Sequence, residues 1–188
     1  LGPALCISPW NFPLNLVAHK IAPALAAGCS ILVKPASGTP LTALRLGAIF
    51  DEAGAPPGAV TVVPCRREIG DRLVADERFR LLSFTGSPEV GWGMKARAGR
   101  KRVVLELGGN AAAIVHEDAD LDDAVARLVP AAFGYAGQSC ISVQRIYVQR
   151  AVHDAFLTRF LPRVEALVVG DPADEATDVG PLIDRANR

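Results

Sequence analysis

The sequence lacks an excess of charge of either sign, and it lacks an apolar run long enough to cross a bilayer. Its 188 residues include 20 Lys plus Arg and 20 Asp plus Glu, so the formal net charge is zero. Nucleic-acid-binding proteins usually carry a basic excess, and a membrane span needs about 20 consecutive apolar residues. Half of the residues are hydrophobic, which is too many for a disordered chain. We therefore expect a globular protein that binds neither nucleic acid nor a membrane.

Cysteine and methionine are also scarce. The four cysteines, Cys6, Cys29, Cys65 and Cys140, form no C-x-x-C pair, so the sequence favours neither a metal site nor a disulfide scaffold. We expect a reduced, cytoplasmic setting, with Cys6 and Cys29 as small buried hydrophobes. The only methionine is Met94, at neither end, and we therefore expect an internal fragment or a processed chain.

Residues 1–108 alternate short apolar runs with longer periodic segments. This pattern predicts strands at 4–8, 30–34, 60–63, 81–84 and 102–107 and helices at 13–27, 40–53, 69–75 and 88–98. Thr39-Pro40 and Ser87-Pro88 resemble helix starts, with a capping residue before a proline. Strands separated by helices predict an α/β fold with a doubly wound, Rossmann-like parallel sheet.

The pattern changes after Gly108-Gly109. The sequence then predicts strands at 111–115 and 144–148, and helices over 121–133 and 152–164, before a polar loop from Gly170. We therefore place a domain boundary at the double glycine. We expect residues 1–108 to form a first domain and residues 109–188 to form part of a second α/β domain.

Short motifs stand at the carboxyl ends of the predicted strands, where doubly wound sheets bind ligands. They are Pro9-Trp10-Asn11-Phe12, Lys34-Pro35-Ala36-Ser37, Phe84-Thr85-Gly86-Ser87 and Glu106-Leu107-Gly108-Gly109, and a fifth, Gly137-Gln138-Ser139-Cys140, follows in the second region. In this order and spacing, the set resembles the aldehyde dehydrogenase superfamily over essentially the whole chain. The resemblance implies NAD(P)-dependent oxidation of a small-molecule aldehyde, in a full-length protein that we expect to be a homo-oligomer. It also implies that residues 1–108 belong to the cofactor-binding domain and residues 109–188 to the catalytic domain.

Three of these residues match the family's catalytic positions. The resemblance implies that Cys140 attacks the aldehyde carbonyl as a thiolate, and that Asn11 donates a hydrogen bond to the resulting oxyanion. Glu106, with a pKa raised by burial, would then activate the water that hydrolyses the thioester. Each residue also has a structural alternative: a buried thiol for Cys140, a surface ion pair for Glu106 and a helix cap for Asn11.

The cofactor site lacks the usual G-x-G-x-x-G pattern. A Gly86-Ser87-Pro88 turn stands there instead, and its helix N-terminus can receive phosphate or can be an ordinary capped helix start. The resemblance implies that the cofactor lies against Ile7, Trp10, Gly86, Ser87, Val90, Leu107 and Gly108.

Lys34 and Ser37 bear on the choice between the two cofactors. NAD-preferring relatives usually have a glutamate at the position of Ser37, which would repel a 2′-phosphate. A serine does not repel it, and Lys34 is able to pair with it. We therefore expect NAD(P) with a preference for NADP.

Two alternatives to this function stay open at the level of sequence. A coenzyme A-acylating relative would share Cys140, although such relatives tend to lack the glutamate found at Glu106. A non-catalytic relative would keep the fold without the chemistry. Ser139 and Ile141, which flank Cys140, do not select a particular aldehyde.

Overall fold

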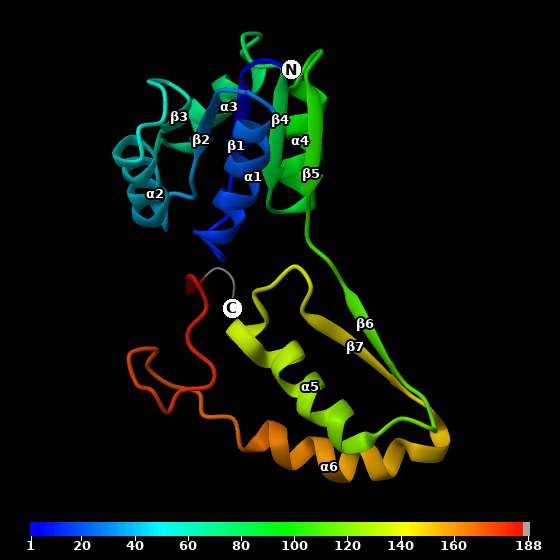
Figure 1. Ribbon diagram of the computed structural model, residues 1–188. Helices are drawn as coiled ribbons and strands as arrows, with labels where there is room; N and C mark the ends of the chain where they lie inside the picture. Colours follow the sequence, from blue (N-terminus) through cyan, green and yellow to red (C-terminus); the bar gives the residue numbers. More distant parts are fainter. Residues whose placement is uncertain (186–188) are drawn as a thin grey trace. The chain divides into compact units, whose positions relative to one another are not determined.

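The computed structural model describes residues 1–185. The chain divides into two compact units, Leu1–Gly108 and Gly109–Arg188 (Figure 1), and each is considered by itself below. Within the described part of the chain, no helix is both long and apolar enough to cross a membrane.

The first unit is built on a five-stranded sheet in the order β3-β2-β1-β4-β5, and every pairing in it is parallel. The strands are β1 (Ala4–Ile7), β2 (Ile31–Lys34), β3 (Val60–Val62), β4 (Leu81–Thr85) and β5 (Arg102–Glu106). The chain runs outward from β1 to β3 and then crosses back to β4, so the strand order reverses between β1 and β4. This confirms the predicted doubly wound α/β sheet and gives it a switch point at which such sheets bind ligands.

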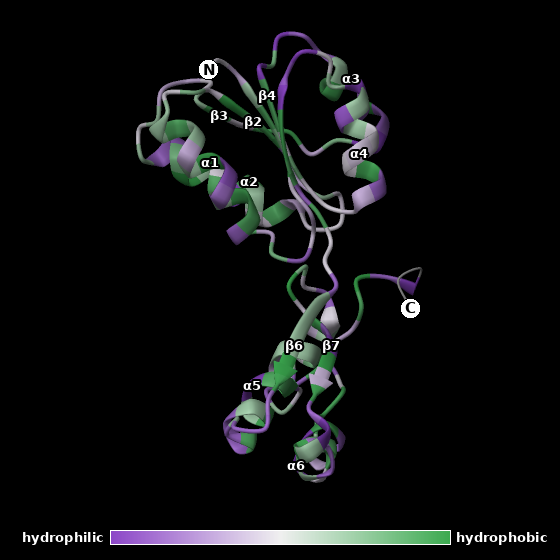
Figure 2. Cartoon of the chain, turned by 90° about the vertical axis from the view of Figure 1, so that its right-hand side faces the viewer, coloured by the Kyte–Doolittle hydropathy of each residue, from purple (hydrophilic) through white to green (hydrophobic). Residues whose placement is uncertain are grey.

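Helices cover both faces of this sheet. They are α1 (Asn15–Ala26), α2 (Pro40–Glu52), α3 (Arg67–Ala75) and α4 (Pro88–Arg97). Figure 2 shows α1 and α2 on one face and α3 and α4 on the other. Side chains of β1 alternate between the two cores: Ala4 and Cys6 pack toward α1, and Leu5 and Ile7 pack toward α4. Both faces of β1 are therefore buried, as expected for a central parallel strand.

The helix starts differ from the sequence-based interpretation in one respect. Thr39 and Ser87 occupy the N-cap positions of α2 and α4, but neither side chain forms a capping hydrogen bond. The Thr39 hydroxyl instead donates to the carbonyl of Trp10 at 3.4 Å. The predicted side-chain caps are therefore wrong, and Thr39 joins two loops at the carboxyl end of the sheet.

The second unit combines a two-stranded parallel sheet with two helices. Its elements are β6 (Ala111–Val115), α5 (Leu121–Phe133), β7 (Val143–Val148) and α6 (His153–Glu165). The core contains Val115, Val129 and Phe156. Asp120 caps α5 by accepting hydrogen bonds from the N–H groups of Asp122 and Asp123.

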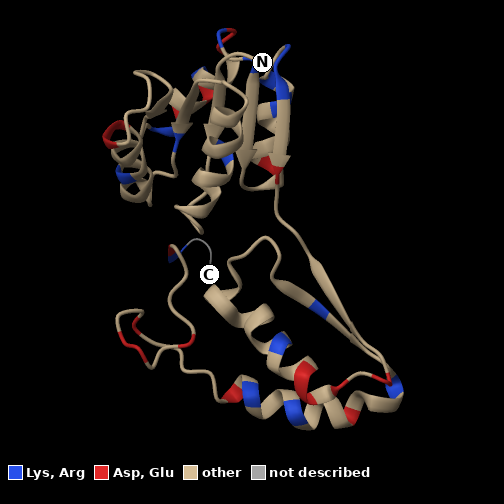
Figure 3. Cartoon of the chain, in the orientation of Figure 1, with Lys and Arg blue, Asp and Glu red and all other residues tan. Residues whose placement is uncertain are grey.

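Basic and acidic residues are both distributed along α6 (Figure 3). One of them, Arg159, contacts Asp122 of α5 at 3.1 Å. Surface pairs of this kind contribute little stability, so the apolar contacts between α5, α6 and the sheet hold the unit together.

Candidate active site

Cys140 lies on the loop between α5 and β7. It is exposed, whereas Cys65 is half-buried and Cys6 and Cys29 are buried, and the structure describes all four cysteines. The burial predicted for Cys6 and Cys29 is confirmed. A buried structural role for Cys140 is wrong, because its thiol is accessible to a ligand.

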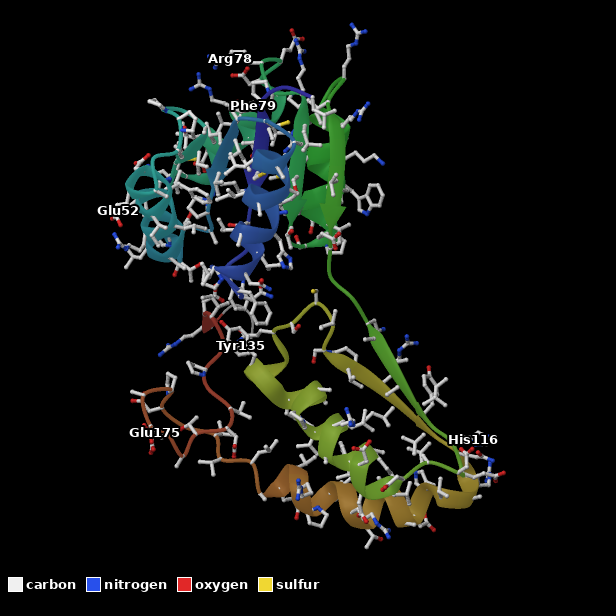
Figure 4. All side chains as sticks on the ribbon, viewed as in Figure 1. Glu52, Arg78, Phe79, His116, Tyr135 and Glu175 are labelled. Atoms are coloured by element: carbon white, nitrogen blue, oxygen red, sulfur yellow. The ribbon has the colours of Figure 1, made fainter. Side chains whose placement is uncertain are left out.

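The backbone just before Cys140 is left-handed over three successive residues. Tyr135, Ala136 and Gly137 have φ values of 58°, 55° and 72°, and Tyr135 is labelled in Figure 4. Only glycine adopts this region without cost, so the two non-glycine residues are strained and must be held by their surroundings. The N–H of Gln138 closes the turn by donating to the carbonyl of Tyr135 at 3.1 Å.

Two further contacts fix the main chain around Cys140. The Ser142 hydroxyl donates to the carbonyl of Ala132, at the end of α5, at 3.1 Å. A Cβ added at Gly109 would lie 2.3 Å from the carbonyl oxygen of Cys140, so only a glycine allows this close approach. Sequence reasoning treated Gly109 as a domain boundary and missed this contact, although the paired glycines after Glu106 were a signal.

Glu106 is the last residue of β5, where it pairs with Thr85 of β4. The residue is exposed, so the burial expected for its carboxyl group is wrong in this structure. The physical reason is that β5 is the edge strand of the sheet and alternates exposed with half-buried residues. Glu106 forms none of the ion pairs found among residues 1–185, so the surface ion pair, its structural alternative, is also not seen.

A buried lysine of the first unit contacts the middle of β4. Lys20 of α1 donates to the hydroxyl of Ser83, on β4, at 2.9 Å. Burial lowers the pKa of the Lys20 ammonium, and the Cys6 thiol and the Glu106 carboxylate act in the opposite direction. Burial raises the pKa of Cys6 to about 11, against the influence of Lys20. The sequence analysis did not single out Lys20. The one indication of its burial is that it lies next to Ile21 on a largely apolar helix.

Asn11 does not cap α1, because this helix begins at Asn15 and has Leu14 at its N-cap position. The Asn11 side-chain oxygen instead accepts a hydrogen bond from the N–H of Phe12 at 3.2 Å. The side-chain amide of Asn11 also carries an NH₂ group, which is a hydrogen-bond donor. A donor of this kind is what an oxyanion requires.

The residues predicted to line the cofactor site gather at the carboxyl ends of β1, β2 and β4. Ile7, the last residue of β1, is buried, and Trp10 is half-buried in the loop that follows it. Ser37 is exposed in the turn after β2. Lys34 is buried and donates to the carbonyl of Pro35 at 3.1 Å. These residues surround the switch point of the sheet.

The turn from β4 into α4 is shaped by close packing of its glycines. A Cβ at Gly86 would lie 2.5 Å from the Phe84 ring, and one at Gly91 would lie 2.6 Å from Leu107. Val90 and Leu107 pack against the same core, and Gly108 is exposed at the end of the unit. Only glycine fits at these two positions, because the Phe84 ring and the Leu107 side chain occupy the space that another side chain would need.

These features fit a dinucleotide. The hydroxyl oxygen of Ser8, at the end of β1, is buried without a hydrogen-bond partner among the described residues. The Ser87 hydroxyl is not used in capping, and the first N–H groups of a helix have no partner within it. Together they offer hydrogen-bond donors to phosphate or ribose oxygens. Residues 1–185 contain no cluster of metal-binding side chains.

Comparison with known proteins settles the family. The chain matches the model of the Aldehyde dehydrogenase family over residues 1–188. The chain belongs to the aldehyde dehydrogenase family. The resemblance inferred from the five motifs is thereby confirmed.

Several aldehyde dehydrogenases are closely similar to this chain. The 3-sulfolactaldehyde dehydrogenase of Priestia aryabhattai is 47% identical over 97% of this chain and 39% of its own length. The succinate-semialdehyde dehydrogenase [NADP(+)] of Escherichia coli is 43% identical over 98% of this chain and 39% of its own length. The crystal structure of aldehyde dehydrogenase 21 from Physcomitrella patens, in complex with succinate, is 50% identical, with a TM-score of 0.94 over 98% of this chain and 39% of that one.

The chain thus spans about two fifths of the length of the curated aldehyde dehydrogenases it matches. Matching structures include an NAD-dependent enzyme and a complex with NADP, so the family uses either cofactor. Asn11, Glu106 and the cofactor-site residues belong to the first unit, and Cys140 belongs to the second.

Proposed function

We propose that the whole protein oxidises an aldehyde to its carboxylic acid with NAD(P), and that Cys140 is the nucleophile. One observation carries this proposal: the exposed thiol of Cys140 follows a strained left-handed turn in a chain of the aldehyde dehydrogenase family. Strained backbone persists where surrounding contacts impose it, and it clusters at active sites.

Carbon–sulfur bond formation is the first chemical step. The Cys140 thiolate adds to the aldehyde carbonyl, and the electron pair of the C=O bond moves to oxygen to give a thiohemiacetal oxyanion. The Asn11 amide nitrogen and the Cys140 N–H donate hydrogen bonds to this oxygen. A bound NAD(P) would supply the hydride acceptor, and loss of a hydride from the thiohemiacetal would leave the acyl group as a thioester on Cys140.

Glu106 completes the reaction by hydrolysis. Its carboxylate takes a proton from water, the resulting hydroxide adds to the thioester carbonyl, and the Cys140 thiolate leaves as the acid forms. This role favours a free acid as the product over an acyl-coenzyme A.

The cofactor would lie at the switch point between β1 and β4, and we propose a preference for NADP. Ile7, Trp10, Val90, Leu107 and Gly108 would contact it, and Gly86 and Ser87 would hold its phosphates at the start of α4. Ser37 adds no negative charge near the adenosine ribose. The Lys34 ammonium has three donors, so it is able to keep its bond to Pro35 and also contact a 2′-phosphate.

A burst experiment with Glu106→Gln tests this mechanism. In the whole protein, this substitution leaves acylation possible but removes the base for deacylation, so we expect one equivalent of reduced cofactor followed by slow turnover. Succinic semialdehyde and 3-sulfolactaldehyde are the first substrates to try, because relatives named for them are 43% and 47% identical. Cys140→Ser is the matched control and should give no burst.

The products and rates of the same experiment distinguish this function from a coenzyme A-acylating enzyme and from a non-catalytic relative. Acyl-coenzyme A formed in preference to the free acid would mean a coenzyme A-acylating enzyme, and wild-type steady-state rates in Glu106→Gln would refute the base. Absence of cofactor reduction by the wild type across the panel would mean a non-catalytic relative. The cytoplasmic location and the homo-oligomer stay predictions from the sequence.

A further inference from the structure

One side chain beside the nucleophile connects two distant segments of the second unit. The Gln138 side-chain nitrogen donates to the carbonyl of Tyr135 at 3.1 Å and to that of Pro181 at 3.4 Å. Its side-chain oxygen accepts from the N–H of Ile183 at 2.9 Å. Gln138 and Ile183 are 45 positions apart in the sequence, so a single amide joins the Cys140 loop to the segment 181–183.

The segment 181–183 follows a stretch of chain that is hydrogen-bonded to residues just after α6. The N–H groups of Asp178 and Val179 both donate to the carbonyl of Val168, at 2.9 and 3.0 Å. The N–H of Gly170 donates in turn to the carbonyl of Val179 at 3.2 Å. Val168 follows closely after α6, which packs on α5, so the segment 181–183 extends from the helical core of the unit.

The turn at Tyr135 and Ala136, which Gln138 contacts in the Cys140 loop, is strained. Tyr135 and Ala136 hold left-handed backbone conformations that cost free energy outside glycine. Gln138 contacts the carbonyl of Tyr135 with both its backbone N–H and its side-chain nitrogen. The side chain therefore holds the turn in its strained form while it fixes the position of the turn against 181–183.

We propose that Gln138 is a positioning residue that sets the place of Cys140 through these three hydrogen bonds. The proposal rests on the proposed role of Cys140 as nucleophile. Cys140 is two residues further along the chain, and a displacement of about 1 Å at a reacting group costs about 100-fold in rate. Gln138 itself touches neither the thiol nor the substrate in this role.

The chemistry of the three partners explains why the residue is a glutamine. Two carbonyls need a donor and one N–H needs an acceptor, and an amide supplies both. An ionised carboxylate accepts only, so in Gln138→Glu the bond to Ile183 survives and the two carbonyls face a negative charge. At low pH the protonated carboxyl regains an O–H donor, which makes this variant a reversible probe of the connection.

The test uses Gln138→Glu and Gln138→Ala in the whole protein, with Gln144→Glu as the matched control. Gln144 is exposed on β7 in the same unit, so its substitution makes the same change of charge away from the connection. We expect the first-turnover burst rate to fall about 100-fold in both Gln138 variants and to stay unchanged in the control. The Kd for the cofactor should change less than about twofold, because its site lies in the first unit.

Two further readouts separate positioning from a general loss of structure. Hydrogen exchange at the Ile183 N–H should accelerate in Gln138→Ala and stay slow in Gln138→Glu, which keeps the acceptor. The burst rate of Gln138→Glu relative to wild type should rise as the pH falls toward 5, whereas the ratio for Gln138→Ala should stay flat.

The outcomes distinguish this proposal from the proposed function. A burst rate within about twofold of wild type in Gln138→Ala, or equal Ile183 exchange in all proteins, overturns the positioning role. If both variants misfold, slow Ile183 exchange in the wild type supports the connection and fast exchange refutes it. Full aldehyde oxidation by Cys140→Ser refutes the proposed function instead, and leaves the hydrogen-exchange result standing.

Discussion

At the scale of single residues, burial divides the cysteines into reactive and inert groups. Cys140 is exposed, while Cys6 is buried and has a pKa of about 11. Since the thiolate is the reactive form, iodoacetamide at pH 8 should modify Cys140 first and Cys65 more slowly in the native protein. Cys6 and Cys29 should react only after unfolding. Peptide mass spectrometry measures the order, and early labelling of Cys6 would contradict the structure.

The raised pKa of Cys6 also predicts a pH dependence of stability. Its pKa rises from 9.0 to about 11 on folding, so the folded state binds the proton more tightly than the unfolded state does. This contribution is fully present below pH 9 and is lost as the pH rises to 11, for a total of up to about 3 kcal/mol. The loss of stability caused by Cys6→Ala should therefore shrink between pH 8 and pH 10.5. Urea unfolding of both proteins at each pH measures this difference, and a constant difference would refute the shift.

At the scale of elements, two glycines of opposite character give a paired prediction. Gly137 has a φ of 72°, whereas Gly93 lies inside the helix α4; an added Cβ would meet its nearest atom at an ordinary distance at both positions, 3.7 Å at Gly137 and 3.6 Å at Gly93. Gly137→Ala should lower the free energy of unfolding by about 1–2 kcal/mol, because alanine disfavours the left-handed conformation. Gly93→Ala should raise it by about 1 kcal/mol, because alanine has the higher helix propensity. Denaturant unfolding should move in opposite directions for the two variants. A shift of the same sign in both would contradict this account.

The elements were predictable from sequence because their signals are local. Apolar runs and the proline of Thr39-Pro40 placed the strands and helices of the first unit to within about two residues. The left-handed turn at Tyr135 and Ala136 was not predictable, since non-glycine residues carry no signal for that conformation. The contacts of Gln138 and Lys20 were not predictable for a related reason. Their partners are set by the tertiary fold, and a lysine on a helix usually lies in water.

At the scale of the whole molecule, Ser37 decides the proposed choice of cofactor. Ser37→Glu places a carboxylate that accepts two hydrogen bonds from ribose hydroxyls and repels a 2′-phosphate. Charge-assisted hydrogen bonds contribute about 1.5–3 kcal/mol, so the ratio of kcat/KM for NADP over NAD should fall about tenfold or more. Both cofactors are compared for both proteins at one salt concentration, because the repulsion is screened. An unchanged ratio would mean that residue 37 does not contact the ribose.

The reversal of strand order between β1 and β4 also bears on how the first unit folds. Ala4 pairs with Ile31 of β2 and with Leu81 of β4, so the second pairing closes a loop almost three times as long as the first. Loop-closure entropy makes the longer closure costlier by about 1 kcal/mol. We therefore expect the β1-β2-β3 half to associate first and β4 to join it later. The crevice proposed to hold the cofactor would then be complete only at the end of folding. A newly synthesised chain would therefore not bind a nucleotide there until β4 has paired with β1.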